Sequence, residues 1–101
     1  MSRVGRYAKA TAKPGQGHAL ADALLEVAAI LEGAAGCELY IVNRSLDEPD
    51  VVWATEVWCS QADLEASLEL DAIKPLFPRV MELLEGRPER IDLVPLGGVG
   101  L

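Results

Sequence analysis

The residue types best suited to chemistry lie close together in residues 51–59, a run of valine, alanine, threonine and tryptophan with high β-propensity. Side chains alternate along a strand, so Glu56 and Trp58 share one face of it. A carboxyl group among apolar neighbours has a raised pKa and can accept a proton, and an indole ring can stack on a planar substrate. Two structural interpretations stay open: Trp58 could be core packing, and Glu56 could hydrogen-bond to a neighbouring strand or helix end.

Four further side chains, Tyr7, Phe77, Met81 and Arg79, could complete such a site. Tyr7 could handle a proton or stabilise an anion. The phenols of Tyr7 and Tyr40 could each donate a hydrogen bond to a substrate oxygen or cover a sheet face, and we expect Tyr40 to cover a sheet face. Phe77 and Met81 lie on the apolar stripe of a predicted helix, where they would shape a substrate pocket or join the core. Arg79 on the same helix would hold a substrate anion if it points inward, or else lie on a solvated face.

Composition argues against several other kinds of function. The 101 residues carry 9 basic and 16 acidic side chains, a net charge of −7, whereas nucleic acids and anionic membranes attract basic surfaces. The only histidine, His18, and the two cysteines, Cys37 and Cys59, lack the spacing of a metal site. The first residues lack the apolar stretch of a signal peptide. We therefore expect a soluble cytoplasmic domain with no metal, no nucleic-acid partner, two free thiols and an exposed His18.

Turn residues and hydrophobic periodicity divide the chain into seven elements. Ser60 opens a capping-box pattern, and Pro75 and Pro78 fit the first turn of a helix that Gly86 ends. The predicted strands are residues 5–12, 37–43, 51–59 and 90–96, and the predicted helices are residues 16–32, 60–70 and 75–85. This β-α-β-β-α-β order is typical of a ferredoxin-like α+β domain, a four-stranded antiparallel sheet with helices on one face. Residues 1–96 would form this domain and residues 97–101 a flexible tail.

The second face of the predicted sheet is also apolar. One layer of helices covers only one face, which would leave Trp53, Val57 and residues such as Leu39 or Ile41 in water. Large exposed apolar patches usually mark an association surface. We therefore expect a homodimer in which two open sheet faces meet.

Three short motifs, in this order and spacing, resemble the antibiotic biosynthesis monooxygenase family. They are Lys13-Pro14-Gly15 before a long helix, Gly36-Cys37 at the start of the second strand, and Glu56-Val57-Trp58 before a capped helix. The resemblance extends over residues 3–95, and its most specific part is residues 57–64. It implies a ferredoxin-like domain that dimerises through its sheet into a dimeric α/β barrel.

The resemblance also implies an activity, because members of this family oxygenate phenols or quinols without metal or flavin. The polyketide-oxidising branch has an asparagine and a tyrosine where this chain has Ala54 and Leu64. The haem-degrading branch needs an axial histidine, and Phe77 stands in that region. The quinol-oxidising type fits best, which predicts a cofactor-independent monooxygenase acting on a small or polycyclic phenol or quinol. The alternatives are a non-catalytic small-molecule-binding dimer and an isomerase acting on an activated carbonyl compound.

Overall fold

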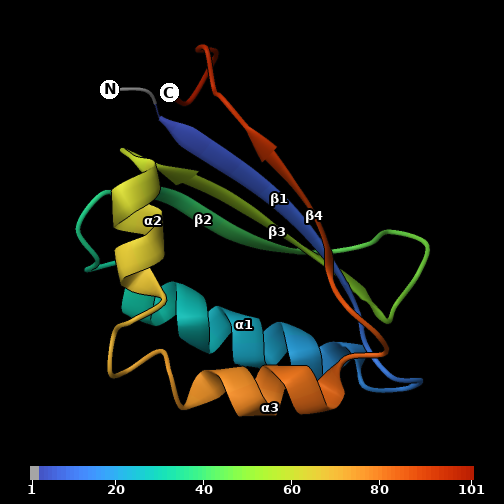
Figure 1. Ribbon diagram of the computed structural model, residues 1–101. Helices are drawn as coiled ribbons and strands as arrows, with labels where there is room; N and C mark the ends of the chain where they lie inside the picture. The colour runs from blue at the N-terminus through green and yellow to red at the C-terminus, as the bar shows by residue number, and fades with distance from the viewer. Residues whose placement is uncertain (1–2) are drawn as a thin grey trace.

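The computed structural model describes residues 3–101 as one sheet and three helices (Figure 1). The elements are β1 (Val4–Thr11), α1 (Gly17–Leu31), β2 (Cys37–Arg44), β3 (Val51–Trp58), α2 (Gln61–Ser67), α3 (Leu76–Leu83) and β4 (Glu89–Leu93). All neighbouring strands are antiparallel and lie in the order β2-β3-β1-β4. The predicted ferredoxin-like α+β fold, with its second helical element broken in two, is therefore confirmed.

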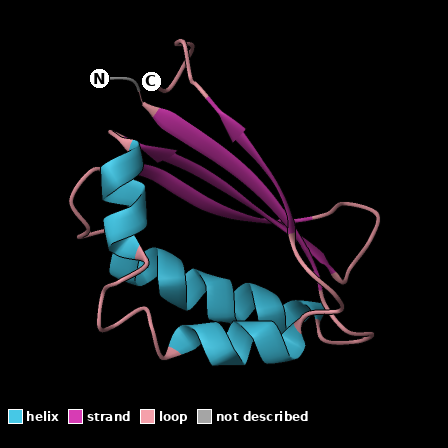
Figure 2. Ribbon diagram, viewed as in Figure 1, coloured by secondary structure: helices cyan, strands magenta, loops and turns pink. Residues whose placement is uncertain are grey.

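The helices cover one face of the sheet, and the other face carries no helix (Figure 2). On the covered face, Val52 and Trp58 of β3 anchor two separate parts of the core. Val52 packs with Leu20 of α1 and with Leu84, and Trp58 packs with Leu64 of α2 among other residues. Because side chains alternate along β3, Glu56 faces the helices between these two clusters.

Local capping explains where the two short helices begin and end. The Ser60 hydroxyl accepts a hydrogen bond from the Asp63 amide at 3.1 Å, which confirms the predicted cap of α2. Helix α2 ends at Ser67, three residues earlier than predicted, where the Ser67 hydroxyl donates to the Leu64 carbonyl. Helix α3 begins at Leu76, one residue later than predicted, with Pro75 as its N-cap. It ends at Leu83 rather than at Gly86, because buried Leu84 turns to an extended conformation and pairs with Ala12.

The start of α1 is held by a residue from a distant loop. The Asp50 carboxylate, just before β3, accepts hydrogen bonds from the amides of Gly15 and Gly17 at 3.1 and 3.0 Å. A Cβ atom at Gly17 would collide with the Pro49 carbonyl, so only glycine allows the helix to start this close to the loop. This contact fixes α1 against the sheet and so fixes one wall of the space above β3.

No helix within residues 3–101 could cross a membrane. The longest, α1, has 15 residues, whereas a spanning helix needs about 20 apolar ones.

Candidate functional site

One polar side chain from each strand lies in a single row on the helix-covered face of the sheet. Tyr40 of β2 pairs with Glu56 of β3, Glu56 with Arg6 of β1, and Arg6 with Asp92 of β4. We call these four residues the polar row. Residues directly opposite each other on antiparallel strands have Cβ atoms about 5 Å apart, so neighbours in the row are within reach of one another.

Arg6 and Asp92 form the most tightly defined contact of the polar row. Arg6 Nε lies 2.7 Å from Asp92 Oδ1, and Nη2 lies 3.5 Å from Oδ2. Arg6 is only 9% exposed, so its positive charge needs this carboxylate. The hydrogen bond and the charge of Arg6 in turn lower the pKa of Asp92 below its ordinary value.

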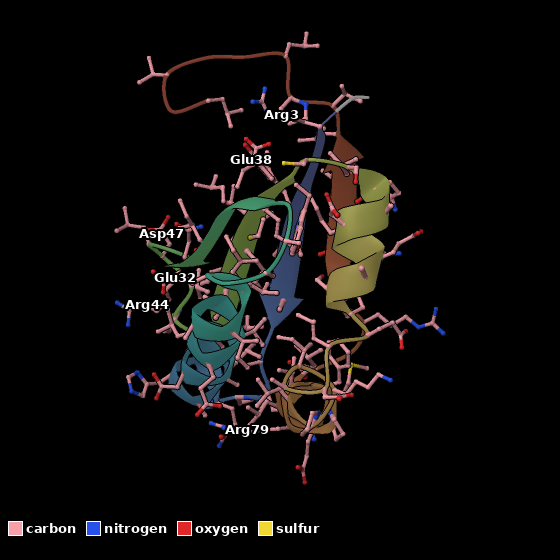
Figure 3. The ribbon with its side chains drawn as sticks, turned by 90° about the vertical axis from the view of Figure 1, so that its left-hand side faces the viewer. Arg3, Glu32, Glu38, Arg44, Asp47 and Arg79 are labelled. Carbon is pink, nitrogen blue, oxygen red and sulfur yellow. The ribbon has the colours of Figure 1, made fainter. Side chains whose placement is uncertain are left out.

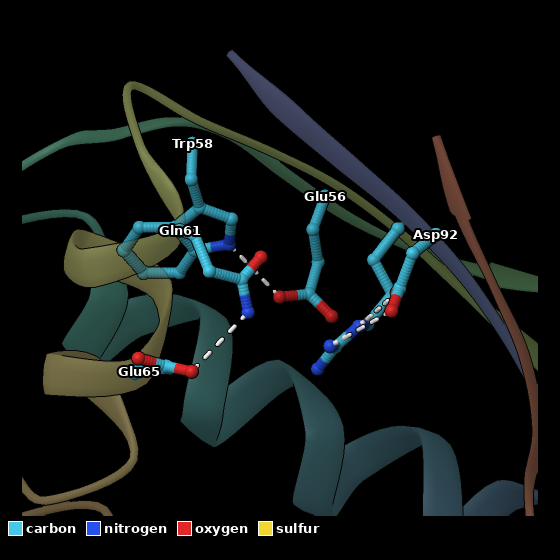
Figure 4. Close-up of polar contacts among 6 residues, drawn as sticks. Glu56, Trp58, Gln61, Glu65 and Asp92 are labelled. Carbon is cyan, nitrogen blue, oxygen red and sulfur yellow. Dashed lines mark hydrogen bonds and ion pairs between the residues drawn. The ribbon is translucent and has the colours of Figure 1, made fainter. Parts of the chain in front are cut away.

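Glu56 lies beside Arg6 in the row and has a different environment. Its Oε1 accepts a hydrogen bond from Trp58 Nε1 at 3.0 Å (Figure 4). Burial raises the pKa of Glu56, and the hydrogen bond from Trp58 and the charge of Arg6 only partly oppose this effect. Glu56 is therefore a carboxyl group with increased proton affinity, and Trp58 holds it in one orientation.

A small cavity of about 160 Å³ lies between the polar row and the helices. Arg6, Tyr40 and Glu56 supply its polar groups on the sheet side. Its walls are largely apolar side chains from α1, α3 and the segment between α2 and α3, including Leu24, Val27, Leu31, Ile73, Phe77 and Val80. A cavity of ~150 Å³ lined by apolar side chains can hold a benzene ring. The space therefore suits one aromatic ring with an oxygen directed at the sheet.

The structure brings two of the six predicted site residues into this cavity. Glu56 and Phe77 both line it. Trp58 does not line it, because its ring is fully buried in the core with Leu64 and Ile73. Trp58 therefore packs in the core and orients Glu56, and it is not placed to stack on a molecule in the cavity. This is the core-packing interpretation that the sequence left open.

The two tyrosines have exchanged the places that the sequence predicted. Tyr7 pairs with Thr55, so it lies on the uncovered face of the sheet and is 46% exposed. Tyr40 pairs with Glu56 and faces the helices instead of the open face. Adjacent positions on a strand point to opposite faces, and the register that places Arg6 beside Glu56 turns Tyr7 away from it. Tyr7 therefore does not join Glu56 in a common site.

Three other candidates lie outside the cavity. Arg79 lies between α1 and α3 (Figure 3), with Nη1 2.6 Å from Glu26 Oε2. Met81 is exposed, and neither Arg79 nor Met81 lines the cavity. His18 is exposed, as expected, and lies 3.4 Å from the Asp22 carboxylate. Both cysteines are free thiols, again as expected.

Arg6 is the functional candidate that sequence reasoning missed. It stands in β1 between Gly5 and Tyr7, with Ala8 and Ala10 at the following positions on the same face. An arginine among such small residues was a usable signal, because alanines on the covered face leave room for a long side chain. Its counter-ion, however, is 86 residues away in the sequence.

The uncovered face carries a wide apolar surface. Tyr7, Ile41 and Trp53 are partly exposed there, together with Leu93 of β4. A groove of about 600 Å³ runs over this face beside the C-terminal residues 94–101. The groove is larger than the cavity above the polar row, and its lining residues carry no ionisable side chain except Tyr7 and Glu56, whose side chain faces the helices.

The sequence of residues 3–77 matches the family model described as antibiotic biosynthesis monooxygenase. The chain belongs to this family. Three solved structures illustrate the similarity. A Chloroflexus aurantiacus J-10-fl protein assigned to the antibiotic biosynthesis monooxygenases is 35% identical, with 96% of each chain covered and a TM-score of 0.87. A Shewanella oneidensis protein is 32% identical, with 92% of each chain covered and a TM-score of 0.80.

A Caulobacter crescentus CB15 protein, also assigned to this family, shares the fold at 22% identity, with a TM-score of 0.87 over 95% of this chain and 92% of the other. A search of curated proteins gave no match.

The raised pKa of Glu56 predicts a pH dependence of stability. A carboxyl group that binds its proton more tightly when folded stabilises the protein below its unfolded pKa, and this contribution is lost as the pH rises through the folded pKa. The free energy of unfolding of the wild type should therefore fall, relative to that of Glu56→Gln, as the pH is raised from about 4 to 8. The lowered pKa of Asp92 changes stability with pH in the opposite direction, but this contribution is common to both proteins and cancels in the comparison.

Urea denaturation at a series of pH values measures this difference. A constant difference between the two proteins at every pH would show that Glu56 ionises as it does in the unfolded chain.

Proposed function

We propose that this protein is a monooxygenase that oxidises a single-ring phenol or quinol with molecular oxygen, using neither metal nor flavin. The observation that carries the proposal is the pairing of a carboxyl group of raised proton affinity, Glu56, with a buried guanidinium, Arg6, at the polar side of an apolar cavity. Membership of the antibiotic biosynthesis monooxygenase family supports the reaction class.

The reaction needs a proton acceptor and a positive charge. Glu56 accepts the phenolic proton, and the Arg6 guanidinium stabilises the phenolate that remains. An electron-rich phenolate can itself pass an electron to oxygen, and the two radicals combine into a ring peroxide, which takes the proton back from Glu56 to become a hydroperoxide. Glu56 then removes the proton of the oxygenated ring carbon as the O–O bond breaks, and it passes this proton to the leaving hydroxide to form water, which restores the site. Phenol and O₂ thus yield para-quinone and H₂O, and a hydroquinone oxygenated at a carbon beside its hydroxyl group yields a hydroxyquinone and H₂O, so one oxygen atom enters the ring.

The size of the cavity narrows the substrate class. About 160 Å³ accommodates one substituted ring, whereas a fused three-ring system would need α3 to move away from the sheet. Of the small and polycyclic substrates that the sequence predicts, we therefore favour the small ones.

Oxygen consumption by the purified, metal-stripped protein, corrected for autoxidation, tests this activity. We expect saturable, protein-dependent uptake with single-ring hydroquinones and a fall in kcat of about 10²- to 10⁴-fold for Glu56→Gln, because the variant has no carboxylate to accept the proton. Glu82→Gln, which changes an exposed glutamate on α3, is the matched control and should keep wild-type activity.

Other outcomes would replace the proposal. Turnover of a carbonyl compound under strict anaerobiosis would indicate an isomerase in which Glu56 moves a proton. Tight binding of phenols without oxygen uptake or turnover would indicate a binding protein.

We also propose that the protein forms a homodimer through the uncovered face of its sheet. The exposed side chains of Tyr7, Ile41 and Trp53 make this face apolar, and Ile91 and Leu93 continue it across β4. An apolar surface that runs across all four strands is unusual for a monomer in water.

Sedimentation velocity at micromolar concentration tests the dimer. The wild type should sediment as a dimer, and Ile41→Glu should sediment as a folded monomer, because it buries a charge at the centre of the interface. Leu25→Glu places the same charge on an equally exposed leucine of α1 and should stay dimeric. A monomeric wild type would contradict the proposed interface.

A further inference from the structure

Tyr40 is placed to contact a ligand in the cavity. It lies beside Glu56 in the polar row, faces the helices and lines the cavity. It also borders a surface groove between α1 and β2. Tyr40 is half-buried, and residues 3–101 contain no buried side-chain oxygen or nitrogen atom that lacks a hydrogen-bond partner. Within these residues no hydrogen bond involves the Tyr40 hydroxyl, so the hydroxyl is an accessible donor that a bound molecule can use.

The surroundings of Tyr40 keep its hydroxyl a donor. Burial raises the pKa of Tyr40, and the neighbouring Glu56 carboxylate raises it further. The phenol therefore stays protonated throughout the pH range in which the protein would be assayed.

Tyr40 and Arg6 flank Glu56 on opposite sides, because β3 lies between β2 and β1. A ligand oxygen placed over Glu56 thus has the Arg6 charge on one side and the Tyr40 hydroxyl on the other. The other cavity walls are largely hydrocarbon, so this is the part of the space best able to bind a negatively charged oxygen.

We propose that Tyr40 is a substrate-binding residue that donates a hydrogen bond to the phenolate oxygen of the substrate, and that it selects hydroxylated rings over rings of the same size without a hydroxyl group. The proposal rests on the proposed function, because it requires that the cavity hold a phenol. Of the two roles that the sequence left open for Tyr40, cover of a sheet face and donation to a substrate oxygen, the geometry favours the second.

Binding of two matched probes tests the proposal. 4-Nitrophenol and nitrobenzene share the ring and the nitro group, and only the first has a hydroxyl group; both are too electron-poor to be consumed by oxygen. Wild-type protein should bind 4-nitrophenol more tightly than nitrobenzene. Tyr40→Phe should weaken 4-nitrophenol binding about 10- to 100-fold, as expected for a lost hydrogen bond to an ion, and leave nitrobenzene binding unchanged.

Tyr7→Phe is the control, because it removes the same hydroxyl from the uncovered face of the sheet. It should bind both probes as the wild type does. The visible absorption of bound 4-nitrophenolate gives a second readout, which should change in Tyr40→Phe and not in Tyr7→Phe.

Three results would overturn the proposal. Equal weakening of both probes by Tyr40→Phe would show a purely structural role, and unchanged binding of both would show no role. Failure of the wild type to bind either probe would overturn this proposal together with the proposed function. Selective binding of 4-nitrophenol through Tyr40, without oxygen uptake in the presence of hydroquinones, would support the binding role of Tyr40 and contradict the proposed monooxygenase activity.

Discussion

A guanidinium group held beneath the helices of this fold needs a carboxylate beside it, and much of the site depends on that constraint. Arg6 is nearly buried, and an unpaired charge there would destabilise the protein by several kcal/mol. Asp92 meets the requirement only if β4 pairs with β1 in the observed register. Every residue of β4 is exposed, so burial contributes little to its position. The strand is held by its backbone ladder and by this ion pair, which completes the polar row at the edge of the sheet.

The two carboxyl groups beside Arg6, those of Asp92 and Glu56, differ in their proton affinity. Asp92 lies at the solvent-exposed edge against Arg6, and its pKa is lowered, whereas Glu56 lies deeper and its pKa is raised. One guanidinium therefore has a permanent counter-ion on one side and a carboxyl group able to exchange protons on the other. Trp58 contributes from the core, because its indole N–H fixes Glu56 without occupying the cavity. When Glu56 takes up a proton and becomes neutral, Arg6 can stabilise the negative charge of a ligand in the cavity.

Local sequence patterns predict the elements of this fold well and its site only in part. The Ser60 cap and the two prolines of α3 act within a few residues, so the sequence alone locates these helices. Alternation along β3 also places Glu56 and Trp58 on one face of the sheet, and the resemblance to the family indicated that the helices cover this face. The relative faces of Arg6, Tyr7 and Tyr40 depend on pairing registers between strands, which no single segment determines.

The volume of the cavity has a similarly non-local origin. It depends on where α3 settles after Pro75, and on the alanines of β1 and β3 that leave space beneath the helices. The contact between Arg6 and Asp92 joins the two ends of the chain, so hydrophobic periodicity carries no signal for it.

The most direct test of the account is the fate of isotopically labelled oxygen. Wild-type protein would be incubated with a single-ring phenol under ¹⁸O₂, and the quinone product analysed by mass spectrometry immediately after quenching. The account predicts that the quinone gains one ¹⁸O atom and that the second appears in water. A quinone without the label, or hydrogen peroxide as the only reduced product of oxygen, would show that the ring is not oxygenated and would contradict the central claim.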